Sequence, residues 1–410
     1  VVASLGWVFD IFEGQIFVAS MREAMPQLLG AESADTPIVQ TWNNYALASF
    51  LLGGAFGGIV FGMMSDRVGR SRTMIVTILF YSVFTCVTAF VNAPWLMVLL
   101  RFLVAMGVGG EWAVASAMVA EVMPKRSRPV MSSIFHASSV FGTLMAVAVG
   151  YFILSARLWG DDTWRLGFLI GIVPALLVVV IRWKMKEPEQ WRQAKEREKQ
   201  DATQVTGSIP ELFGSRNVRN TLVGVTLATI GLVTFWGCHI YGKNALMRSV
   251  QKEVLVQDGV AAGADKAQKQ SAFKSHSSEI KQAEMISMCL NTVGGGLGLV
   301  LFGWISNMLG RKGAFVFYHV GGFAMALLMF LVLIPQDASF QVLCLALPVF
   351  GFLTLGMHAG YAVYFPELFP TRLRGTGTGF CFNAGRFGTA AAMLLAGQMA
   401  WGPEETALYM

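Results

Sequence analysis

The chain has 410 residues, of which 54% are apolar and only 14% are charged, whereas a soluble domain carries roughly 25% charged residues. This composition argues against a soluble protein and favours an all-α integral membrane protein. The net charge of +6 does not indicate a nucleic-acid partner, because Lys and Arg are concentrated on one predicted membrane face.

Apolar segments long enough to cross a membrane recur along the whole chain. A spanning helix needs roughly 20 mainly apolar residues, and this rule predicts spans at residues 1–29, 42–65, 73–92, 94–121, 129–156, 164–184, 218–248, 283–306, 313–334, 338–364 and 374–401. A twelfth is expected from the repeats described next. The chain begins inside an apolar run and stops at Met410, so we expect both ends to be trimmed relative to the natural gene product.

Two loop motifs each occur twice, in the same order. Residues 121–128 (Glu-Val-Met-Pro-Lys-Arg-Ser-Arg) recur as residues 367–374 (Glu-Leu-Phe-Pro-Thr-Arg-Leu-Arg). Residues 62–70 recur in weaker form as residues 303–311. Repetition of this kind in a membrane protein indicates two similar halves that rock against each other.

The repeats and the spans divide the chain into two helical bundles, residues 1–184 and 218–410, joined by a charged linker at residues 185–217. The linker is predicted to contain a surface helix that ends near residues 211–214. Residues 249–282 form a polar insertion with the composition of a solvated helical hairpin or a mobile loop. We favour a variable decoration over a partner-binding element for this insertion.

The distribution of Lys and Arg predicts the orientation in the membrane. The loops after the second, fourth, eighth and tenth spans carry Lys and Arg, whereas residues 30–41, 91–95 and 335–337 carry none. The positive-inside rule therefore places the first set of loops, the N-terminus and the central linker in the cytoplasm.

The loop motifs resemble those of the major facilitator superfamily. Residues 62–72 are similar to that superfamily's motif between helices 2 and 3, and residues 303–312 resemble its degenerate copy between helices 8 and 9. The resemblance covers essentially the whole chain. It implies a major facilitator fold of two pseudo-symmetric six-helix bundles, with 12 helices expected and 11 visible in this chain.

Two shorter segments narrow the resemblance. Residues 6–13 (Gly-Trp-Val-Phe-Asp-Ile-Phe-Glu) are similar to the G-W-x-x-D-x-x-D segment of lactate/sialate and related metabolite:proton symporters, with Glu in the second acidic place. Residues 383–388, which contain Asn383 and Arg386, resemble a segment of organic-ion and aromatic-acid carriers whose Arg meets an anionic substrate. The implied activity is symport of an organic acid with protons.

Ionisable residues at membrane depth are costly and default to functional candidates. Asp10 and Glu13 lie one turn apart on one face of the first span, and Arg101 in the fourth span lies at about the depth of Glu13 by the rise per residue. We expect an acid–Arg contact that couples proton binding to transport; a permanent ion pair is the alternative. The sequence does not assign the proton to Asp10 or to Glu13. Glu111 is a further candidate, for a relay or a polar contact.

Arg386 lies about 18 Å into the last predicted span, with no acid in its own span. A guanidinium in this position suits a carboxylate, because its donors match both oxygens. An ion pair with Asp10 or Glu13 is the alternative. The other candidate substrate contacts are polar or aromatic residues of the spans, namely Gln15, His136, Trp236, Tyr241, Asn291 and Asn383.

The resembling family uses its loop charges to hold the two halves together on the cytoplasmic side. By that resemblance the candidate gate residues are Asp66, Arg67, Arg70, Glu121, Arg126, Arg128, Arg311, Glu367, Arg372 and Arg374. The alternative is that these charges only set the topology.

The sequence therefore predicts a secondary active transporter of the cell membrane, a proton-coupled symporter of a small organic anion such as a monocarboxylate or a sugar acid. The alternatives are a neutral sugar or polyol:proton symporter and a non-transporting receptor or scaffold on the same fold. The sequence has no phosphate loop, no nucleophile–base constellation and no metal or disulfide spacing among its five cysteines. We therefore predict no enzyme, no cofactor and no metal. The expected partners are the anion, protons and the bilayer, and the expected state is a monomer.

Overall fold

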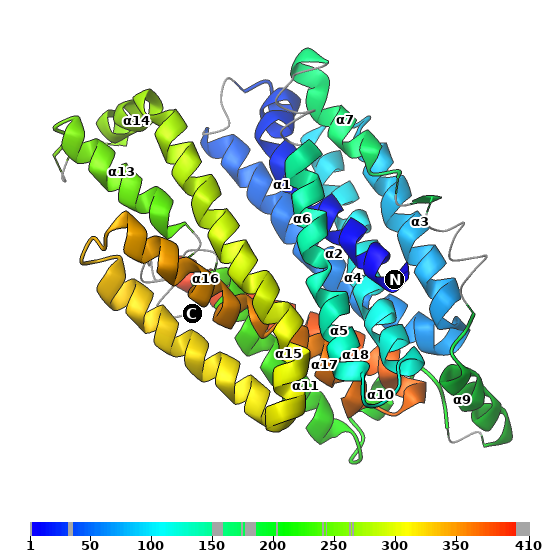
Figure 1. Ribbon diagram of the computed structural model, residues 1–410. Coiled ribbons are helices and arrows are strands. Elements are labelled where there is room, and N and C mark those ends of the chain that lie inside the picture. Colours follow the sequence, from blue (N-terminus) through cyan, green and yellow to red (C-terminus); the bar gives the residue numbers. More distant parts are fainter. Residues whose placement is uncertain are drawn as a thin grey trace. The chain divides into compact units, whose positions relative to one another are not determined.

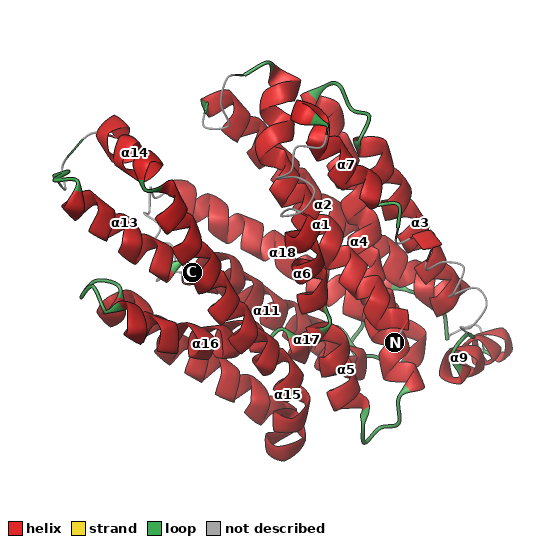
Figure 2. Cartoon of the chain, turned by 45° about the horizontal axis from the view of Figure 1, so that its top comes forward, coloured by secondary structure: helices red, strands yellow, loops and turns green. Residues whose placement is uncertain are grey.

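The computed structural model describes residues 2–31, 36–149, 159–173, 175–176, 186–201, 204–239, 242, 244–261, 264 and 266–398. Every regular element within these residues is a helix, and none is a strand (Figure 2). The predicted all-α fold is confirmed.

The contacts divide the chain into two compact units, each described here by itself. Unit 1 comprises residues 1–229 and 361–387, and unit 2 comprises residues 230–360 and 388–410. The division into two bundles and a linker, which the repeats indicate, stays a prediction.

The helices are labelled in Figure 1. Unit 1 holds α1 (Val2–Leu29), α2 (Pro37–Val68), α3 (Arg70–Thr88), α4 (Pro94–Val122), α5 (Arg128–Ala137), α6 (Ser139–Val149), η2 (Gly160–Asp162), α7 (Thr163–Ile170), α9 (Glu189–Gln200), α10 (Ile209–Leu212) and η5 (Thr371–Leu373). Unit 2 holds η3 (Phe235–His239), α13 (Ala245–Gln257), α14 (Lys266–Ser275), α15 (Ser277–Leu327), η4 (Leu328–Leu333) and α16 (Phe340–Gly356). Three helices continue from one unit into the other: α11 (Val218–Thr234), α17 (Ala359–Leu368) and α18 (Arg374–Gln398).

Within the described residues, five helical segments are long and apolar enough to cross a membrane: Thr41–Val68, Arg70–Thr88, Pro94–Val122, Gln282–Leu333 and Phe340–Leu368. Large apolar side chains such as Phe56, Phe141, Val316 and Leu345 are exposed on the helices. Apolar side chains on the outside are expected where lipid, and not water, surrounds a helix.

The repeated loops of the sequence have matching backbones. Gly69 separates α2 from α3 with φ 123°, and Gly310 bends α15 with φ 73°. Glycine populates positive φ without the steric cost that a Cβ imposes. The backbone is not helical at Gly310, so α15 consists of two helices that meet at this kink. The predicted span 283–306 lies in the first of them, and the predicted span 313–334 lies in the second and its extension η4.

Two predicted spans are interrupted by a short break. The span at residues 129–156 divides into α5 and α6 at Ser138, whose Oγ donates to Phe135 O at 2.7 Å and so competes with the helical pattern. The span at residues 338–364 divides into α16 and α17 at residues 357–358.

The central linker differs from its prediction in one respect. Its surface helix, α9, ends at Gln200, and residues 209–212 form a separate short helix, α10. Between them the chain turns at Gly207, with φ 68°, and Pro210 opens α10, as the first turn of a helix tolerates.

Small residues bring α2, α4 and α18 close together in unit 1. A Cβ on Gly54, Gly58 or Gly62 would overlap or crowd atoms of α18, and one on Gly109 would overlap the backbone of α2. Glycine at every fourth position lets membrane helices approach at backbone distance. This stripe on α2 sets the position of the first part of α18, which carries Asn383 and Arg386.

Candidate functional site

Glu13 and Arg101 form a buried ion pair between α1 and α4. Arg101 Nη1 lies 2.6 Å from Glu13 Oε1, and both side chains are at most 1% exposed. Thr85 Oγ1 also donates to Glu13 Oε1 at 3.1 Å, and Arg101 Nη2 donates to Thr88 Oγ1 at 2.6 Å. The guanidinium lies over the ring of Phe17, with 5.1 Å to its centroid. It also lies over the ring of Phe168, with 4.9 Å to its centroid, so the cation is held by one carboxylate and two aromatic faces.

Asp10 lies one turn before Glu13 and is equally buried, but neither of its carboxyl oxygens has a hydrogen-bond partner among the described residues. Its electrostatic neighbours are Glu111, Glu13 and the hydroxyl of Tyr81. Two further acids thus lie near it. The structure pairs Arg101 with Glu13 and shows no ion pair between Asp10 and any described cation.

Glu111 is fully buried in α4. Thr77 Oγ1 donates to its Oε2 at 2.6 Å, and Oε1 has no partner among the described residues. A Cβ on Gly6 would lie 2.6 Å from Glu111 Oε1. The absence of a side chain at Gly6 therefore makes room for this carboxyl group between α1 and α4.

His136 connects a line of aromatic side chains. Trp7 Nε1 donates to His136 O at 3.1 Å, and the two rings stack with centroids 5.4 Å apart. Trp112 Nε1 donates to His136 Nδ1 at 3.2 Å. Trp112 also stacks on Phe382, with centroids 4.0 Å apart. The rings run from α1 through α5 and α4 to α18.

Arg386 continues this line. Its guanidinium carbon lies 5.5 Å from the centroid of the Phe382 ring, and Gly54 provides the space it occupies. It forms no ion pair with any carboxylate that the structure describes. Asn383, one turn earlier, donates from Nδ2 to Gly379 O at 2.8 Å, while its Oδ1 lacks a described partner.

A second charged network surrounds Arg70 where α2 gives way to α3. Arg70 is fully buried and pairs with Asp66 at 2.5 Å and with Glu121 at 2.7 Å. Asp66 accepts hydrogen bonds from the backbone N–H groups of Gly375 (3.0 Å) and Thr376 (2.7 Å). A carboxylate at this position satisfies the first amides of α18 and complements the positive end of the helix.

The loop before α18 completes this network. Arg70 Nη2 donates to Thr371 O at 3.1 Å, and Arg374 lies 3.3 Å from Glu121 Oε1. We call Asp66, Arg70, Glu121, Arg374 and the backbone of residues 371–376 the α2–α18 network.

The central linker contacts the α2–α18 network directly. Glu187 accepts hydrogen bonds from the backbone N–H groups of Arg70 (2.6 Å), Ser71 (3.2 Å) and Arg72 (3.2 Å). Trp191 Nε1 donates to Asp66 O at 2.8 Å. Further along the linker, the carboxylate of Glu211 forms a bidentate ion pair with Arg372. Hydrogen bonding to this carboxylate raises the pKa of Arg372.

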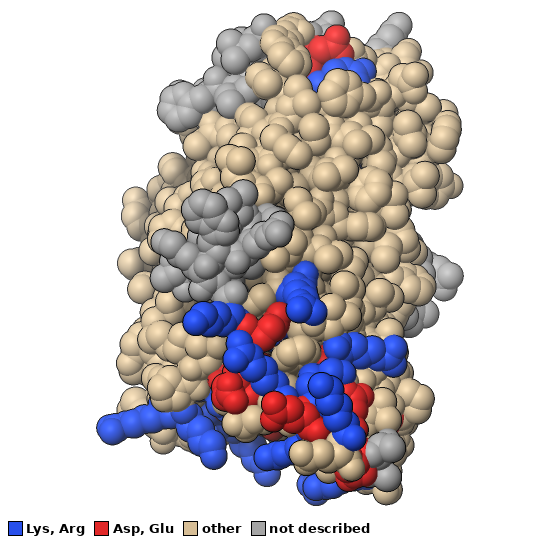
Figure 3. Space-filling model, turned by 90° about the vertical axis from the view of Figure 1, so that its right-hand side faces the viewer, with Lys and Arg blue, Asp and Glu red and all other residues tan. Residues whose placement is uncertain are grey.

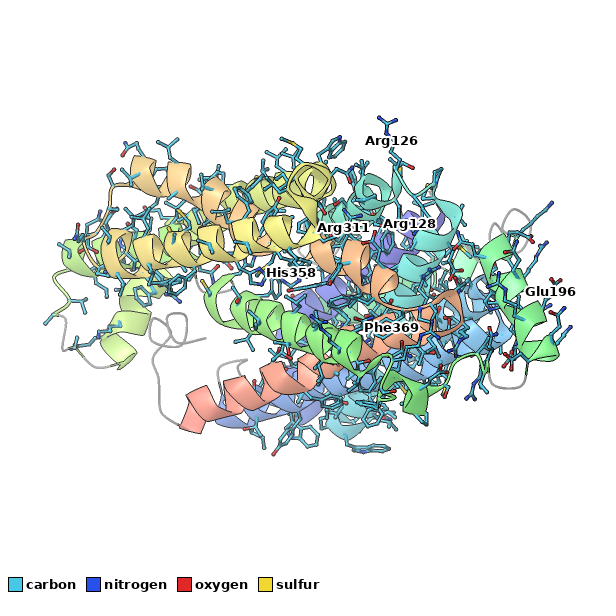
Figure 4. All side chains as sticks on the ribbon, turned by 90° about the horizontal axis from the view of Figure 1, so that it is seen from below. Arg126, Arg128, Glu196, Arg311, His358 and Phe369 are labelled. Atoms are coloured by element: carbon cyan, nitrogen blue, oxygen red, sulfur yellow. The ribbon has the colours of Figure 1, made fainter. Side chains whose placement is uncertain are left out.

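The other predicted gate residues lie outside this network. Arg67 and Arg126 are exposed and form no ion pair with a described residue, and Figure 4 shows Arg126 pointing away from the helices. Arg128 donates to Met123 O at 3.5 Å and forms no ion pair with a residue that the structure describes. Glu367 is exposed.

Figure 3 shows that the charged side chains on one face of the molecule gather mainly at one end of that face.

Arg311 belongs to unit 2 and donates to Ser306 Oγ at 2.9 Å, so it stabilises its own turn.

Unit 2 has a polar cluster around His239. Its Nδ1 lies 2.8 Å from Thr354 Oγ1, and its Nε2 lies 3.3 Å from Asn291 Nδ2. The imidazole stacks between Phe235 and Phe350, with centroids 5.0 and 6.1 Å away. The predicted substrate residue Asn291 therefore lies beside a histidine.

Three further substrate residues stay predictions. The side chain of Trp236 and the whole of Tyr241 lie outside the described residues. Gln15 is exposed on α1, and no described residue is seen to hydrogen-bond with it.

Trp112 and Phe382 belong to the site but were not among the predicted residues. Both adjoin predicted ones, because Trp112 follows Glu111 and Phe382 lies four residues before Arg386 on one helix face. Their positions relative to Glu111 and Arg386 are the sequence signal that could have identified them as site residues.

The chain matches the models of two known families. The model of the Major Facilitator Superfamily matches residues 11–255, and that of the Sugar (and other) transporter family matches residues 256–400. The chain belongs to the major facilitator superfamily. It is therefore a multi-pass membrane transporter and not an enzyme.

Among superfamily members, the chain is 30% identical over 363 residues to the cis,cis-muconate transport protein of Acinetobacter baylyi, covering 87% of this chain and 78% of that protein. It is 27% identical to the sialic acid transporter NanX of Escherichia coli, covering 96% and 85%. It is also 27% identical to the gentisate transporter of Corynebacterium glutamicum, covering 97% and 80%.

A solved structure of the proton:xylose symporter XylE has the same fold. The TM-score is 0.75 at 16% identity, covering 100% of this chain and 91% of that one. The major facilitator fold predicted from the sequence is confirmed.

Proposed function

We propose that this transporter is a proton-coupled symporter of a small organic anion that works by alternating access. It resides in the cell membrane with its N-terminus and central linker in the cytoplasm, where the Lys- and Arg-rich loops lie. The names of its relatives support an acidic substrate, since they refer to muconate, sialic acid and gentisate.

Arg386 is the observation that carries this proposal. A guanidinium inside a membrane protein needs an anion, and no described carboxylate supplies one, because Glu13 is engaged by Arg101. The carboxylate of a substrate fits the donor fork of Arg386. A neutral sugar would leave this charge without compensation.

The rings beside Arg386 narrow the class of anion. Phe382 and Trp112 stack on each other next to the guanidinium. Planar π-systems favour offset stacking or edge contacts with other rings. We therefore propose an unsaturated or aromatic carboxylate, with Asn383 as a hydrogen-bonding neighbour.

Asp10 is the proposed carrier of the coupled proton. A carboxylate buried without a counter-ion costs far more free energy than the neutral acid at the same place. Glu13 already has its counter-ion in Arg101, so it orients Arg101 and does not need a proton. Asp10 also lies beside Glu111, which offers a second carboxyl group for relay.

The α2–α18 network is the proposed cytoplasmic gate in its closed form. It ties the end of α2 to the start of α18 through buried ion pairs and helix capping. Opening on this side requires these contacts to separate.

The test uses purified protein in vesicles with an imposed pH gradient. Gentisate, cis,cis-muconate and sialic acid are the probe anions, and xylose is the neutral comparison. We expect an inward proton gradient to drive uptake of a carboxylate and not of xylose. Arg386→Gln should lower apparent substrate affinity about 100-fold, the equivalent of losing a buried charged pair of about 3 kcal/mol.

The matched control is Arg219→Gln, which removes an exposed arginine of α11 and should leave uptake unchanged. Arg386→Lys keeps the charge without the fork and should retain part of the affinity. If Arg386→Gln transports the carboxylate as the parent protein does, Arg386 does not bind the substrate. Proton-driven uptake of xylose alone would favour a sugar symporter.

A further inference from the structure

A cavity of about 1080 Å³ lies beside the α2–α18 network and is lined only by residues of unit 1. Its walls come from α9, from the segment between α9 and α11, from the start of α11, and from the stretch between the last residue of α17 and the first residue of α18. Small-molecule sites have volumes of about 300–1,000 Å³. The cavity is therefore large enough for a metabolite-sized ligand.

The wall is polar and has an excess of positive charge. It carries four arginines, Arg197, Arg216, Arg372 and Arg374, against two acids, Asp201 and Glu211. The remaining polar lining consists mainly of side-chain amides of Asn and Gln, each of which has two N–H donors. A concave surface with one dominant sign of charge concentrates ions of the opposite sign.

The four arginines differ in how they are neutralised. Arg372 is engaged by Glu211, and Arg374 by Glu121. Arg197 and Arg216 are exposed and form no ion pair with a described residue. Figure 4 shows Glu196, the neighbour of Arg197, projecting outward from α9. The guanidinium groups of these two arginines thus meet no carboxylate among the residues that the structure describes.

We propose that this cavity is a cytoplasmic binding site for a compact multivalent oxyanion, a phosphate or a di- or tricarboxylate, held by Arg197 and Arg216. Guanidinium forks bind such oxygens in pairs, and the amides of the wall donate to the remaining oxygens. This ligand is distinct from the transported anion, because the cavity reaches α18 only at its first residue, Arg374, and Arg386 lies about 18 Å further along that helix by the rise per residue.

The bound anion stabilises the closed gate. Two parts of the chain build the cavity, the linker and the loop before α18, and Gly207 N–H donates to Arg372 O at 2.9 Å across their junction. Asn220 Nδ2 donates to Leu368 O at 2.7 Å in the same wall. A ligand that binds only this docked arrangement shifts the population toward it. This step rests on the proposed gate.

The binding experiment uses the full chain in detergent, titrated calorimetrically with inorganic phosphate and with succinate at constant ionic strength. We expect both dianions to bind and chloride not to bind. Arg197→Gln and Arg216→Gln should each weaken binding about tenfold, as expected for one charge-assisted contact. The matched controls Arg192→Gln on α9 and Arg219→Gln on α11 remove exposed arginines that do not line the cavity and should bind like the parent protein.

A comparison in lipid separates two sources of phosphate. If lipid headgroups fill the site, inorganic phosphate should bind more weakly in phosphatidylglycerol nanodiscs than in phosphatidylcholine nanodiscs. If the ligand is a free anion, the two affinities should agree. Absence of binding by either dianion, or equal binding by the double variant R197Q/R216Q, overturns the site.

Hydrogen exchange at residues 368–376 tests the effect on the gate without requiring transport. Phosphate should slow this exchange in the parent protein and leave it unchanged in the double variant. Binding without slower exchange overturns the stabilisation of the gate. Failure of every probe anion to be transported overturns the proposed function alone, because binding and exchange are measured independently of it.

Discussion

Asp10 and Glu13 occupy the same face of α1 but have different surroundings. Glu13 accepts two hydrogen bonds and pairs with Arg101, whereas Asp10 accepts none from the described residues. Removing charge has opposite consequences at the two positions. At Glu13 it leaves a buried cation without a counter-ion, and at Asp10 it removes an uncompensated carboxyl group.

The two neutral substitutions are therefore expected to separate coupling from stability. Asp10→Asn should fold with a melting temperature close to that of the parent and exchange substrate across vesicles, but it should not accumulate substrate in response to a pH gradient. Glu13→Gln should lower the free energy of unfolding by about 3–5 kcal/mol, because Arg101 loses its buried partner. Thermal unfolding and paired exchange and accumulation assays measure both effects.

The control is Thr85→Val, which removes one hydrogen bond to Glu13 and keeps both charges. It should reduce stability by about 1 kcal/mol and retain accumulation. Proton-driven accumulation of substrate by Asp10→Asn would mean that Glu13 or Glu111, and not Asp10, carries the coupled proton.

The sequence predicts that Asp10, Glu13 and Arg101 lie at about the same depth, but it does not predict which of the two acids pairs with Arg101. The rise per residue brings Arg101 level with the acids of α1, while rotation about the helix axes decides which acid it meets. Thr85 and Thr88 of α3 help to fix that choice, and neither has a sequence signature of its own. The line of rings that contains Trp112 and Phe382 depends likewise on how α4 and α18 pack.

The polar insertion at residues 249–282 lies in unit 2 and contains a pair of helices. A helical hairpin is one of the two structures that its composition predicts. Figure 1 shows α13 and α14 beside each other, and the two helices are in contact. His276, between α14 and α15, has its Nε2 3.2 Å from Asp258 Oδ1 and its Nδ1 3.5 Å from Glu279 Oε2. These contacts join the end of α13 to the start of α15.

The order of this insertion is expected to depend on pH. The hydrogen bond to Asp258 and the charge of Glu279 raise the pKa of His276 above its ordinary value. A raised pKa means that the contact stabilises the folded hairpin fully below the ordinary histidine pKa and is lost as pH rises through the raised value. Amide exchange in α13 and α14, corrected for intrinsic rates, should therefore be faster at alkaline pH.

His276→Gln should remove this pH dependence. Asp337→Asn breaks the Lys252–Asp337 pair (2.8 Å), which contains no histidine, and should change exchange equally at both pH values. A parent protein with equal protection at acid and alkaline pH would contradict the role of His276.

Element boundaries show where sequence rules suffice. Pro37 and Pro94 open α2 and α4, as the preference for proline in the first turn predicts. The breaks in the predicted spans at Ser138 and at residues 357–358 follow no such rule, because they depend on tertiary contacts. Ser138 Oγ contacts Ser4 O of α1 at 3.2 Å, and Gly356 packs against Tyr318.

On the scale of the whole molecule, the two copies of the loop motif have diverged. In the first copy Asp66 is fully buried and accepts from three groups of α18. In the second copy Asn307 occupies the matching position and is exposed. The repeat predicted two similar halves, but it did not show that, among the described residues, the first copy caps another helix and the second copy is not seen to do so. A carboxylate complements the positive end of a helix with a full charge, which an amide lacks, and the Asp66/Asn307 difference is the sign of this in the sequence.

This divergence leads to a prediction about the gate. Asp66→Asn removes the charge that pairs with Arg70 and complements the positive end of α18. We expect this to destabilise the closed arrangement by about 3 kcal/mol, which lowers its population relative to the open one roughly a hundredfold. Exchange of the amides of Gly375 and Thr376, which Asp66 now protects, should rise accordingly, and substrate uptake should fall. Hydrogen exchange and initial uptake rates in vesicles measure the two effects.

Asn307→Asp is the matched control, because it restores the same carboxylate to the second copy at an exposed position. Surface changes of this kind usually alter stability by less than about 0.5 kcal/mol, so uptake should stay within roughly twofold. If both variants impair uptake alike, the two loops contribute equally and the asymmetry of the gate is wrong. If neither variant impairs uptake, the ion pairs around Arg70 only set the topology. A gate that still works without the carboxylate of Asp66 is held closed by other contacts.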